Sequence, residues 1–268
     1  MDTSDRERQY WNERAREAAA GPDLETYRVR PTDRSDPAVP WLPYLGVPAL
    51  VDVLLGALGD VRDKPVLDLG TGTGFLAVLL ALRGARVTAV DVAGEQLATA
   101  RERARISGVA DAIEFREMAS ETLDFPTGAF AAVTGSFVLH HLDLARAGRE
   151  IRRVLVPGGH AAFIETSARN PLLMLSRTFL VGRFGIPRAS SPDEAPLGKA
   201  AERTLAEVFP GGVRVHCPNL LFLRMLPAYV GIIRRPGIMA VAKRLDEWLW
   251  RIPPLRPWSY FVVVELVG

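Results

Sequence analysis

The stretch VLDLGTGTG, residues 66–74, constrains the fold of this chain more than any other part of the sequence. Its first four residues suit a buried strand because three of them are apolar, and the next five are glycine and threonine. Residues 75–82 continue as an apolar stretch with the length of a short helix. A strand, a tight glycine turn and a helix N-terminus let backbone N–H groups and the helix dipole approach a nucleotide-like ligand.

The spacing of the three glycines discriminates between possible ligands. They fall at positions 70, 72 and 74, which gives G-x-G-x-G. The dinucleotide fingerprint G-x-G-x-x-G would need its third glycine at position 75, where this chain has Phe75. No lysine followed by serine or threonine closes the loop, so a P-loop is also excluded. A cradle for pyrophosphate is therefore not the favoured interpretation of this turn.

Two carboxylates accompany the glycine turn. Asp68 stands just ahead of the glycines, and Asp91 closes the next predicted strand, RVTAVD at 86–91. A carboxylate in the second position can accept charge-assisted hydrogen bonds from both hydroxyls of a ribose. The pair therefore indicates a nucleoside-like ligand at the ends of two strands.

Four motifs in this order, VLDLGTGTG, VTAVD, FVLHHL and LVPGG, resemble those of the class I S-adenosylmethionine (SAM) dependent methyltransferases. Within that class the chain is similar to the small-molecule (methyltransferase type 11-like) enzymes, such as the quinone and sterol C-methylating type. The resemblance covers residues 64–166 well and the rest of the chain more loosely. It implies a Rossmann-like α/β fold, with a doubly wound, mostly parallel seven-stranded sheet, helices on both faces, an antiparallel last strand and helical cap insertions.

The alternation of strand and helix patterns along the core also predicts a parallel sheet. Strands are predicted at 65–69, 86–91, 112–117, 129–136 and 160–165, and later at 213–217 and 260–267. Helices are predicted at 4–20, 49–58, 74–83, 94–107, 143–155 and 197–209. The triplet Pro157-Gly158-Gly159 is expected to end one helix and to turn the chain into the next strand.

The resemblance implies a cofactor site along the carboxyl edge of the sheet. Its motifs place around SAM the residues Tyr10, Asp68, Gly70, Thr71, Gly72, Gly74, Asp91, Val92, Met118, Ala119, Ser136 and His141. Relatives usually carry an acid where this chain has Met118, so adenine recognition is expected to use the Ala119 backbone and stacking on Val92. Tyr10 is the candidate for the carboxylate end of the cofactor, unless Tyr10 and Trp11 only pin their helix to the body.

Methyl transfer needs few catalytic groups because the SAM sulfonium already activates the methyl group. The protein mainly aligns the acceptor in line with the carbon–sulfur bond and excludes water. A general base is needed only if the acceptor keeps its proton until attack, and the candidates are His141, His140 and Glu165. One histidine of such a pair more often lines the family's cofactor pocket, and Glu165 could equally be a satisfied polar group. No metal-ligand motif is present, so metal dependence is not expected.

Composition limits the classes of partner and the cellular compartment that we expect for this chain. A net charge of +2 over 268 residues is too small an excess to indicate nucleic acid. The single cysteine, Cys217, excludes an internal disulfide and is expected to be a buried structural thiol. The N-terminus is polar without a signal peptide, and no apolar run approaches the ~20 residues of a membrane span, which favours a cytoplasmic protein.

The chain is expected to be a single domain with elaborations around its core. Residues 1–60 are predicted to form an N-terminal helical lid, 61–165 the SAM-binding core, 166–200 a cap insertion, and 201–268 the C-terminal part of the core. A helical insertion at 219–257 is apolar and aromatic, with seven basic residues against two acidic ones. It could pack on the sheet, form an apolar substrate cap, or dock on an anionic membrane or a dimer partner. The first two interpretations are favoured together.

These observations predict a SAM-dependent methyltransferase (EC 2.1.1 type) that forms S-adenosylhomocysteine as its product. The acceptor is expected to be small and hydrophobic, such as a secondary metabolite, a quinone-like ring or a lipid-like molecule, and the enzyme a monomer or homodimer. One alternative is a fold relative that binds SAM but uses it only to bind or to steer another reaction. A second is a nicotinamide-dependent oxidoreductase, against which Phe75 in the glycine fingerprint argues.

Overall fold

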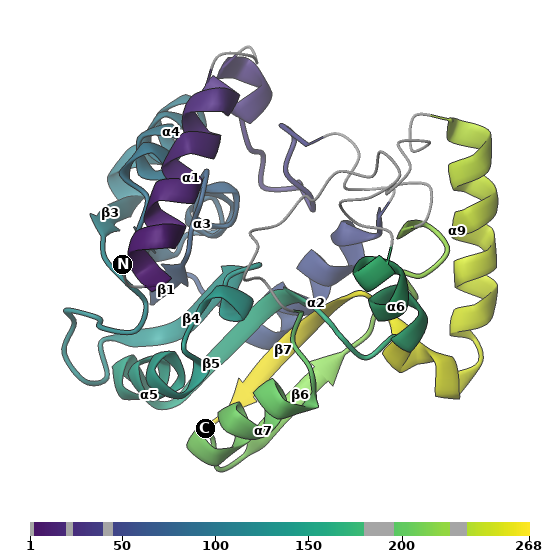
Figure 1. Cartoon of the computed structure of the whole chain (residues 1–268). Helices are drawn as coiled ribbons and strands as arrows, with labels where there is room; N and C mark the ends of the chain where they lie inside the picture. Colours follow the sequence, from purple (N-terminus) through teal and green to yellow (C-terminus); the bar gives the residue numbers. More distant parts are fainter. Residues whose placement is uncertain (1–2, 20–23, 40–44, 180–195, 226–234) are drawn as a thin grey trace.

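The computed structural model describes residues 3–19, 24–39, 45–179, 196–225 and 235–268. Within them the central element is a seven-stranded sheet in the order β3-β2-β1-β4-β5-β7-β6 (Figure 1). The strands are β1 (Pro65–Leu69), β2 (Arg86–Asp91), β3 (Ile113–Glu117), β4 (Phe130–Ser136), β5 (Leu155–Thr166), β6 (Gly212–His216) and β7 (Phe261–Val267). Neighbouring strands from β3 to β5 are parallel, and β7 runs antiparallel between β5 and β6. The predicted doubly wound sheet with an antiparallel last strand is therefore confirmed.

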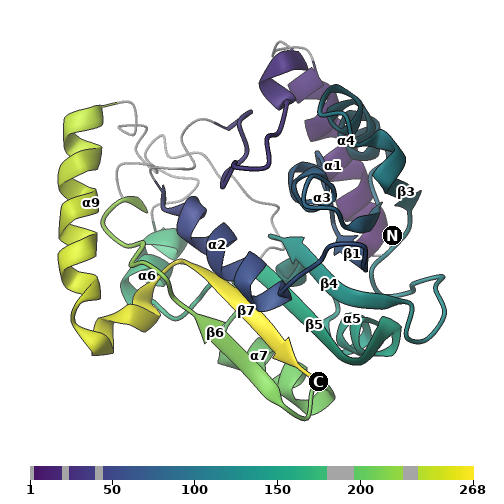
Figure 2. The same ribbon diagram turned by 180° about the vertical axis from the view of Figure 1, so that it is seen from behind.

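Helices cover both faces of this sheet (Figures 1 and 2). Those described are α1 (Thr3–Ala19), α2 (Val47–Leu58), α3 (Phe75–Ala81), α4 (Gly94–Ile106), α5 (Leu144–Val154), α6 (Pro171–Phe179), α7 (Lys199–Val208) and α9 (Pro236–Trp250). Successive strand residues point to opposite faces, so β1 serves two apolar cores. Val66 packs in one core with residues of α2 and α3, whereas Leu67 packs in the other with residues of α5 and α7.

The position of β1 in the middle of the sheet determines where a ligand can bind. Val66, Leu67, Asp68 and Leu69 are all at most 1% exposed, which is the burial pattern of a strand covered on both faces. β1 pairs with β2 on one side and with β4 on the other. The connections after β1 and β4 therefore diverge at their carboxyl ends, which is the topological switch point of an open α/β sheet.

One local prediction is wrong. Pro157, Gly158 and Gly159 do not form a turn ahead of the fifth strand, because β5 already begins at Leu155. Phe130 of β4 pairs with Leu155, but Ala132, two residues later, pairs with His160, so the extra residues of β5 form an irregularity. Proline lacks a ladder N–H and Gly158 has φ +73°, so this triplet suits a bulge within a strand.

Two helices lie in the predicted insertions. α6 falls within residues 166–200, and α9 falls within residues 219–257, where a helical insertion was predicted. Residues 180–195 and 226–234 of these insertions lie outside the described part of the chain. Among the described residues, no helix combines the length and the apolar character that crossing a membrane requires.

Candidate cofactor site

A cavity of about 650 Å³ opens at the carboxyl edge of the sheet, where the connections of β1 and β4 diverge. The predicted site residues that line it come from the glycine turn, the end of β2, the end of β4 and the turn that follows β4; they are Gly70, Gly72, Asp91, Val92, Ser136 and His141. Helix α1 contributes Glu7 and Trp11 to the same lining. The structure therefore brings half of the predicted cofactor residues together around one cavity.

The glycine turn leaves space beside its middle glycine. Gly70 and Gly72 both have positive φ, +59° and +52°, which side chains rarely adopt. A Cβ on Gly70 would lie 2.4 Å from Cγ2 of Val138, whereas a Cβ on Gly72 would meet no atom within 4 Å. Gly72 therefore presents bare backbone to the cavity, which a closely approaching ligand requires.

The Asp91 carboxylate ties this turn to the end of β2. Its Oδ2 accepts the Gly72 N–H at 2.8 Å, and its Oδ1 accepts the Ala93 N–H at 2.9 Å. Burial raises the pKa of Asp91, and these two backbone hydrogen bonds oppose that rise. Each carboxylate oxygen has two lone pairs, so both oxygens retain acceptor capacity toward the cavity. The ribose contact predicted for Asp91 is compatible with these bonds and stays a prediction.

Asp68 lies beneath the turn and does not line the cavity. Its Oδ2 accepts the Thr71 hydroxyl at 2.7 Å, while its Oδ1 is buried without a hydrogen-bond partner. Burial raises the pKa of this carboxyl group to about 7. Gly74 has a packing role, because a Cβ there would lie 2.7 Å from the Cβ of Ala100 on α4. These predicted residues shape the turn from below.

Glu165 holds the turn that follows β4 from inside the protein. Its Oε1 accepts the N–H groups of Val138 and Leu139 at 2.9 and 2.6 Å, and its Oε2 lies 2.5 Å from Nδ1 of His140. The side chains of Glu165 and His140 are 0% and 3% exposed, and neither lines the cavity. Phe137, at the start of this turn, has φ +56°, which is uncommon for a bulky residue. Glu165 therefore stabilises a strained turn, and a catalytic role for Glu165 or His140 stays an untested prediction.

His141 is the predicted base that reaches the cavity, and helix α1 orients it. Its Nδ1 lies 3.3 Å from Oε2 of Glu7, although the two groups are not aligned for a hydrogen bond. The Trp11 indole N–H donates to the same Glu7 oxygen at 2.8 Å, and the Trp11 ring meets the His141 ring edge-on at 5.8 Å. A histidine, a carboxylate and an indole thus form one cluster on the cavity wall.

The phase of helix α1 decides which aromatic residue faces the cavity. Glu7 and Trp11 are four residues apart and lie on one helix face, whereas the predicted Tyr10 packs edge-on against Trp11 at 5.1 Å and does not line the cavity. The Glu7/Trp11 spacing is the signal that could have identified both residues. The cofactor contact predicted for Tyr10 has no support from this lining.

The cavity lining near the predicted adenine edge begins at Ser120, after Met118 and Ala119. The Met118 N–H donates to the Asp91 carbonyl at 3.1 Å, which extends the β2–β3 ladder, and neither Met118 nor Ala119 lines the cavity. Ser120 and Glu121 line it instead. Gln96 of α4 also lines the cavity, and its Oε1 is buried without a hydrogen-bond partner. This orphaned acceptor was not predicted, since no spacing rule relates it to the glycine turn.

Helix α1 is fastened to the element that follows β2. Arg8 donates to the Val92 carbonyl at 3.2 Å, and Arg16 pairs with Glu95 at 3.0 Å. The Glu95 N–H, in the first turn of α4, donates to the Asn12 side chain at 3.0 Å. These contacts keep α1, and with it the Glu7–Trp11 pair, against the cavity.

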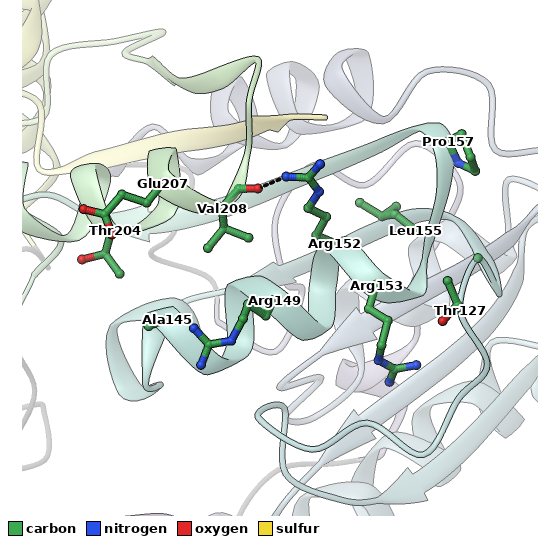
Figure 3. A pocket seen from close by; sticks show the side chains of 11 residues that line it. Thr127, Ala145, Arg149, Arg152, Arg153, Leu155, Pro157, Thr204, Glu207 and Val208 are labelled. Atoms are coloured by element: carbon green, nitrogen blue, oxygen red, sulfur yellow. Dashed lines mark hydrogen bonds between the residues drawn. The ribbon is translucent and has the colours of Figure 1, made fainter.

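A second cavity, of about 640 Å³, lies between α5 and α7 and has the same size but different chemistry (Figure 3). Three arginines line it: Arg149, Arg152 and Arg153. Arg152 donates to the Val208 carbonyl, and Arg153 donates to the Leu123 carbonyl at 2.9 Å and to Glu150. This cavity contains none of the predicted site residues, so its size alone does not make it the site.

The core of the chain is similar to known methyltransferases. The family model described as a methyltransferase domain matches residues 67–163. A demethylmenaquinone methyltransferase of Thermus thermophilus is 43% identical over 109 residues, which are 40% of this chain and 49% of that protein. A ubiquinone biosynthesis O-methyltransferase of Sodalis glossinidius is 38% identical over 125 residues, which are 46% of this chain and 49% of that protein. The chain therefore spans about half the length of the curated relatives that it matches.

A solved structure extends the likeness of fold beyond the core. The crystal structure of a geranyl diphosphate C-methyltransferase from Streptomyces coelicolor, in complex with Mg²⁺, geranyl diphosphate and S-adenosyl-L-homocysteine, superposes with a TM-score of 0.57. The match covers 99% of this chain and 97% of that chain at 17% sequence identity. Identity this low establishes a shared fold, including the elements outside the core.

Proposed function

We propose that this chain, whose residues 67–163 belong to the methyltransferase domain family, transfers a methyl group from SAM to a small hydrophobic acceptor. The observation that carries the proposal is the bare backbone of Gly72, held by the Asp91 carboxylate at 2.8 Å beside the switch-point cavity. A larger residue at this position would occupy the space that a nucleoside needs. The names of the quinone-related relatives support the same reaction class.

The residues around the cavity fit SAM. Gly72 leaves room for close approach, and Asp91 keeps acceptor capacity for ribose hydroxyls. The buried, unpartnered Oε1 of Gln96 is an acceptor that a donor on the ligand would satisfy, since leaving it unpaired is unfavourable. Asp68 adds a second orphaned acceptor, Oδ1, beneath the turn. We assign Gly72, Asp91 and Gln96 to direct contact with the cofactor, and Asp68 to the same site as the residue that supports the turn from below.

The lining also supports an apolar acceptor. Beyond the glycine turn, the cavity is walled by the side chains of Trp11, Val39, Phe137, Val138 and Leu142. Such a wall favours a ring or a chain over a highly polar metabolite, because a polar acceptor would lose hydration without finding partners. The quinone-ring substrates named for the relatives have this character.

In this proposal His141 accepts the proton that the acceptor loses. SAM, when bound, supplies a methyl group that its sulfonium already activates. Because Nδ1 of His141 faces Glu7, Nε2 is the nitrogen left for the acceptor. The Glu7 carboxylate stabilises the imidazolium that forms, and the Trp11 N–H bond at 2.8 Å holds that carboxylate in place. Trp11 and the wall of apolar side chains exclude water from the acceptor.

Calorimetry and a transfer assay test the proposal together. The chain is titrated with S-adenosylhomocysteine and with NAD, and is then incubated with methyl-labelled SAM and a demethylated quinone. The proposal expects binding of S-adenosylhomocysteine, no binding of NAD, and label in the quinone product. NAD binding in its place would overturn the cofactor assignment. Cofactor binding without transfer to any of a panel of apolar acceptors would favour a SAM-binding protein that steers another reaction.

A further inference from the structure

Helix α9 exposes a continuous apolar stripe to solvent. Ile252, which is 39% exposed, lies just beyond the helix end at Trp250. The members within α9, which we call the α9 stripe, recur every three or four residues and are 43, 57, 46 and 59% exposed: Ile238, Val241, Leu245 and Trp248. This spacing places them along one side of a helix. An isolated exposed leucine needs no explanation, but a continuous row of large apolar side chains marks a contact surface.

The residues of the stripe are exposed, and packing against the described part of the protein does not account for them. Helix α9 contacts the protein through the opposite face of the helix. Met239 and Asp246 on that face are 1% and 0% exposed. Asp246 accepts the Leu223 N–H at 2.8 Å and the Arg224 side chain at 3.0 Å, and the Trp250 indole N–H donates to the Cys217 carbonyl at 2.9 Å. The inner face of α9 therefore makes the intramolecular contacts, and the outer face is left over.

The α9 stripe also has no place in the cofactor cavity. The described lining of that cavity includes no residue of the 219–257 insertion. In Figures 1 and 2, α9 stands at the end of the molecule opposite α1, beyond α6 and the β6–β7 edge. The helix that carries the stripe therefore lies apart from α1, which lines the cofactor cavity.

Basic side chains surround the stripe. The exposed charged residues between 235 and 256 are five basic ones and a single acid: Arg235, Lys243, Arg244, Arg251, Arg256 and Glu247. Arg244 lies three residues after Val241 and four before Trp248, and Arg251 lies three residues after Trp248, so both border the same side of the stripe. Glu247 is partly neutralised by Lys243 at 3.8 Å.

We propose that α9 docks this protein onto an anionic lipid surface, with the α9 stripe in the interface and Arg244 and Arg251 at the phosphates. A helix with an apolar face, a bordering row of basic side chains and a tryptophan has the composition of an interfacial helix. Anionic lipid complements the basic border. A second copy of the chain does not, because a two-fold contact through this face would bring two basic borders together. The proposal goes beyond the proposed function and stands independently of it.

Vesicle co-sedimentation of the full chain tests this surface. The wild-type chain is expected to pellet with phosphatidylglycerol vesicles at low salt, to pellet far less with phosphatidylcholine vesicles, and to be released at high salt. The double variants Leu245→Gln/Trp248→Gln and Arg244→Glu/Arg251→Glu are each expected to lower partitioning about tenfold or more. Circular dichroism and urea unfolding establish that each variant is folded.

Two matched controls isolate the surface. Arg86→Glu changes one exposed arginine to an acid on β2, and Leu175→Gln removes an apolar side chain that is 57% exposed on α6. Both are expected to leave partitioning within about twofold. Failure of the wild-type chain to bind either vesicle overturns the proposal. An equal loss of vesicle partitioning in the control variants also overturns the proposal. The same holds if no vesicle binds and sedimentation velocity shows a dimer that the Leu245→Gln/Trp248→Gln change abolishes.

Discussion

Two buried carboxylates, Glu165 and Asp246, perform the same task in two regions of the molecule. Each is 0% exposed, and each accepts backbone N–H groups from a turn elsewhere in the chain. Glu165 accepts two such bonds and contacts His140, whereas Asp246 accepts the Leu223 and Arg224 N–H groups and the Arg224 side chain. In both places one carboxylate fixes a turn that has no regular hydrogen-bond ladder of its own.

The difference between the two lies in what the fixed segment faces. The turn held by Glu165 contributes Phe137, Val138 and His141 to the cofactor cavity. The turn held by Asp246 fastens α9, whose outer face meets solvent. The same kind of buried carboxylate can therefore support a ligand cavity in one region and an exposed surface in another. The role of each carboxylate has to be inferred from what the segment that it holds faces, the cavity or the solvent.

The largest effect is expected when the carboxylate beneath the cavity is removed. Glu165→Ala leaves the Val138 and Leu139 N–H groups buried and unpaired, and should cost about 3–5 kcal/mol of unfolding free energy. It should also abolish measurable binding of S-adenosylhomocysteine, because Phe137 and Val138 lose their support. Urea unfolding and calorimetry provide the two measurements.

Asp246→Ala is the matched change in the other region. It should destabilise the chain by a comparable amount but leave the Kd for S-adenosylhomocysteine within about twofold, since α9 lies outside the cavity. An equal loss of cofactor binding in both variants would contradict the independence of the two regions.

A second variant tests whether the supported turn carries chemistry. His141→Gln should lower kcat about 10²-fold with little change in the Kd for S-adenosylhomocysteine, because it removes a proton acceptor rather than a cofactor contact. Glu7→Gln should shift the pH profile of kcat, since Glu7 lies 3.3 Å from the imidazole. The neighbouring variant His140→Gln should affect stability more than kcat. A kcat unchanged in His141→Gln would remove the base from the proposal.

Asp68 is a third buried carboxylate, and it differs from Glu165 and Asp246 because its Oδ1 has no hydrogen-bond partner. The pKa of Asp68 is raised to about 7, above its ordinary value of 3.8, so the native state holds a proton that the unfolded chain releases. The Asp68 contribution to stability is therefore complete below pH 4 and is lost as the pH rises through 7. Between pH 5 and pH 8 the wild-type chain should lose about 2–3 kcal/mol that Asp68→Asn does not lose. Parallel pH profiles in urea unfolding would contradict this expectation.

The smallest change in stability is expected at two glycines. Gly72→Ala and Gly108→Ala both add a methyl group where φ is positive and space is open, so each should cost about 1 kcal/mol. Gly72→Ala should in addition weaken S-adenosylhomocysteine binding at least tenfold, whereas Gly108→Ala should not change it. Equal affinities in the two variants would remove the glycine turn from the binding site.

The sequence predicted the parts of the molecule whose signals are local. The bounds of β1 and β2 agree with the prediction, because β1 runs directly into the glycine turn and β2 ends at Asp91. Gly72 and Asp91 line one cavity because the turn and the strand end are adjacent in a parallel sheet of this topology, and their cofactor contacts stay predictions. The bulge at Pro157 was mistaken for a turn, since the residue types that form both are the same.

The rest of the site depends on tertiary packing that no local pattern encodes. Trp11 rather than Tyr10 lines the cavity because of how α1 is rotated against α4. Glu165 reaches the turn after β4 only through the register that sets Ser136 beside Ile164 in the neighbouring strand. Gln96 became visible as an orphaned acceptor only once its burial was known.

The hydrogen bond between the Asn12 side chain and α4 has a further consequence. By accepting the Glu95 N–H at 3.0 Å it serves as the N-cap of α4, a task usually performed by the residue just before a helix, which here is Ala93. The first turn of α4 directly follows Asp91, so the N-terminal segment stabilises the strand end next to it. A protein trimmed to residues 67–163 would therefore begin α4 uncapped, and its measured cofactor affinity would understate that of the intact chain.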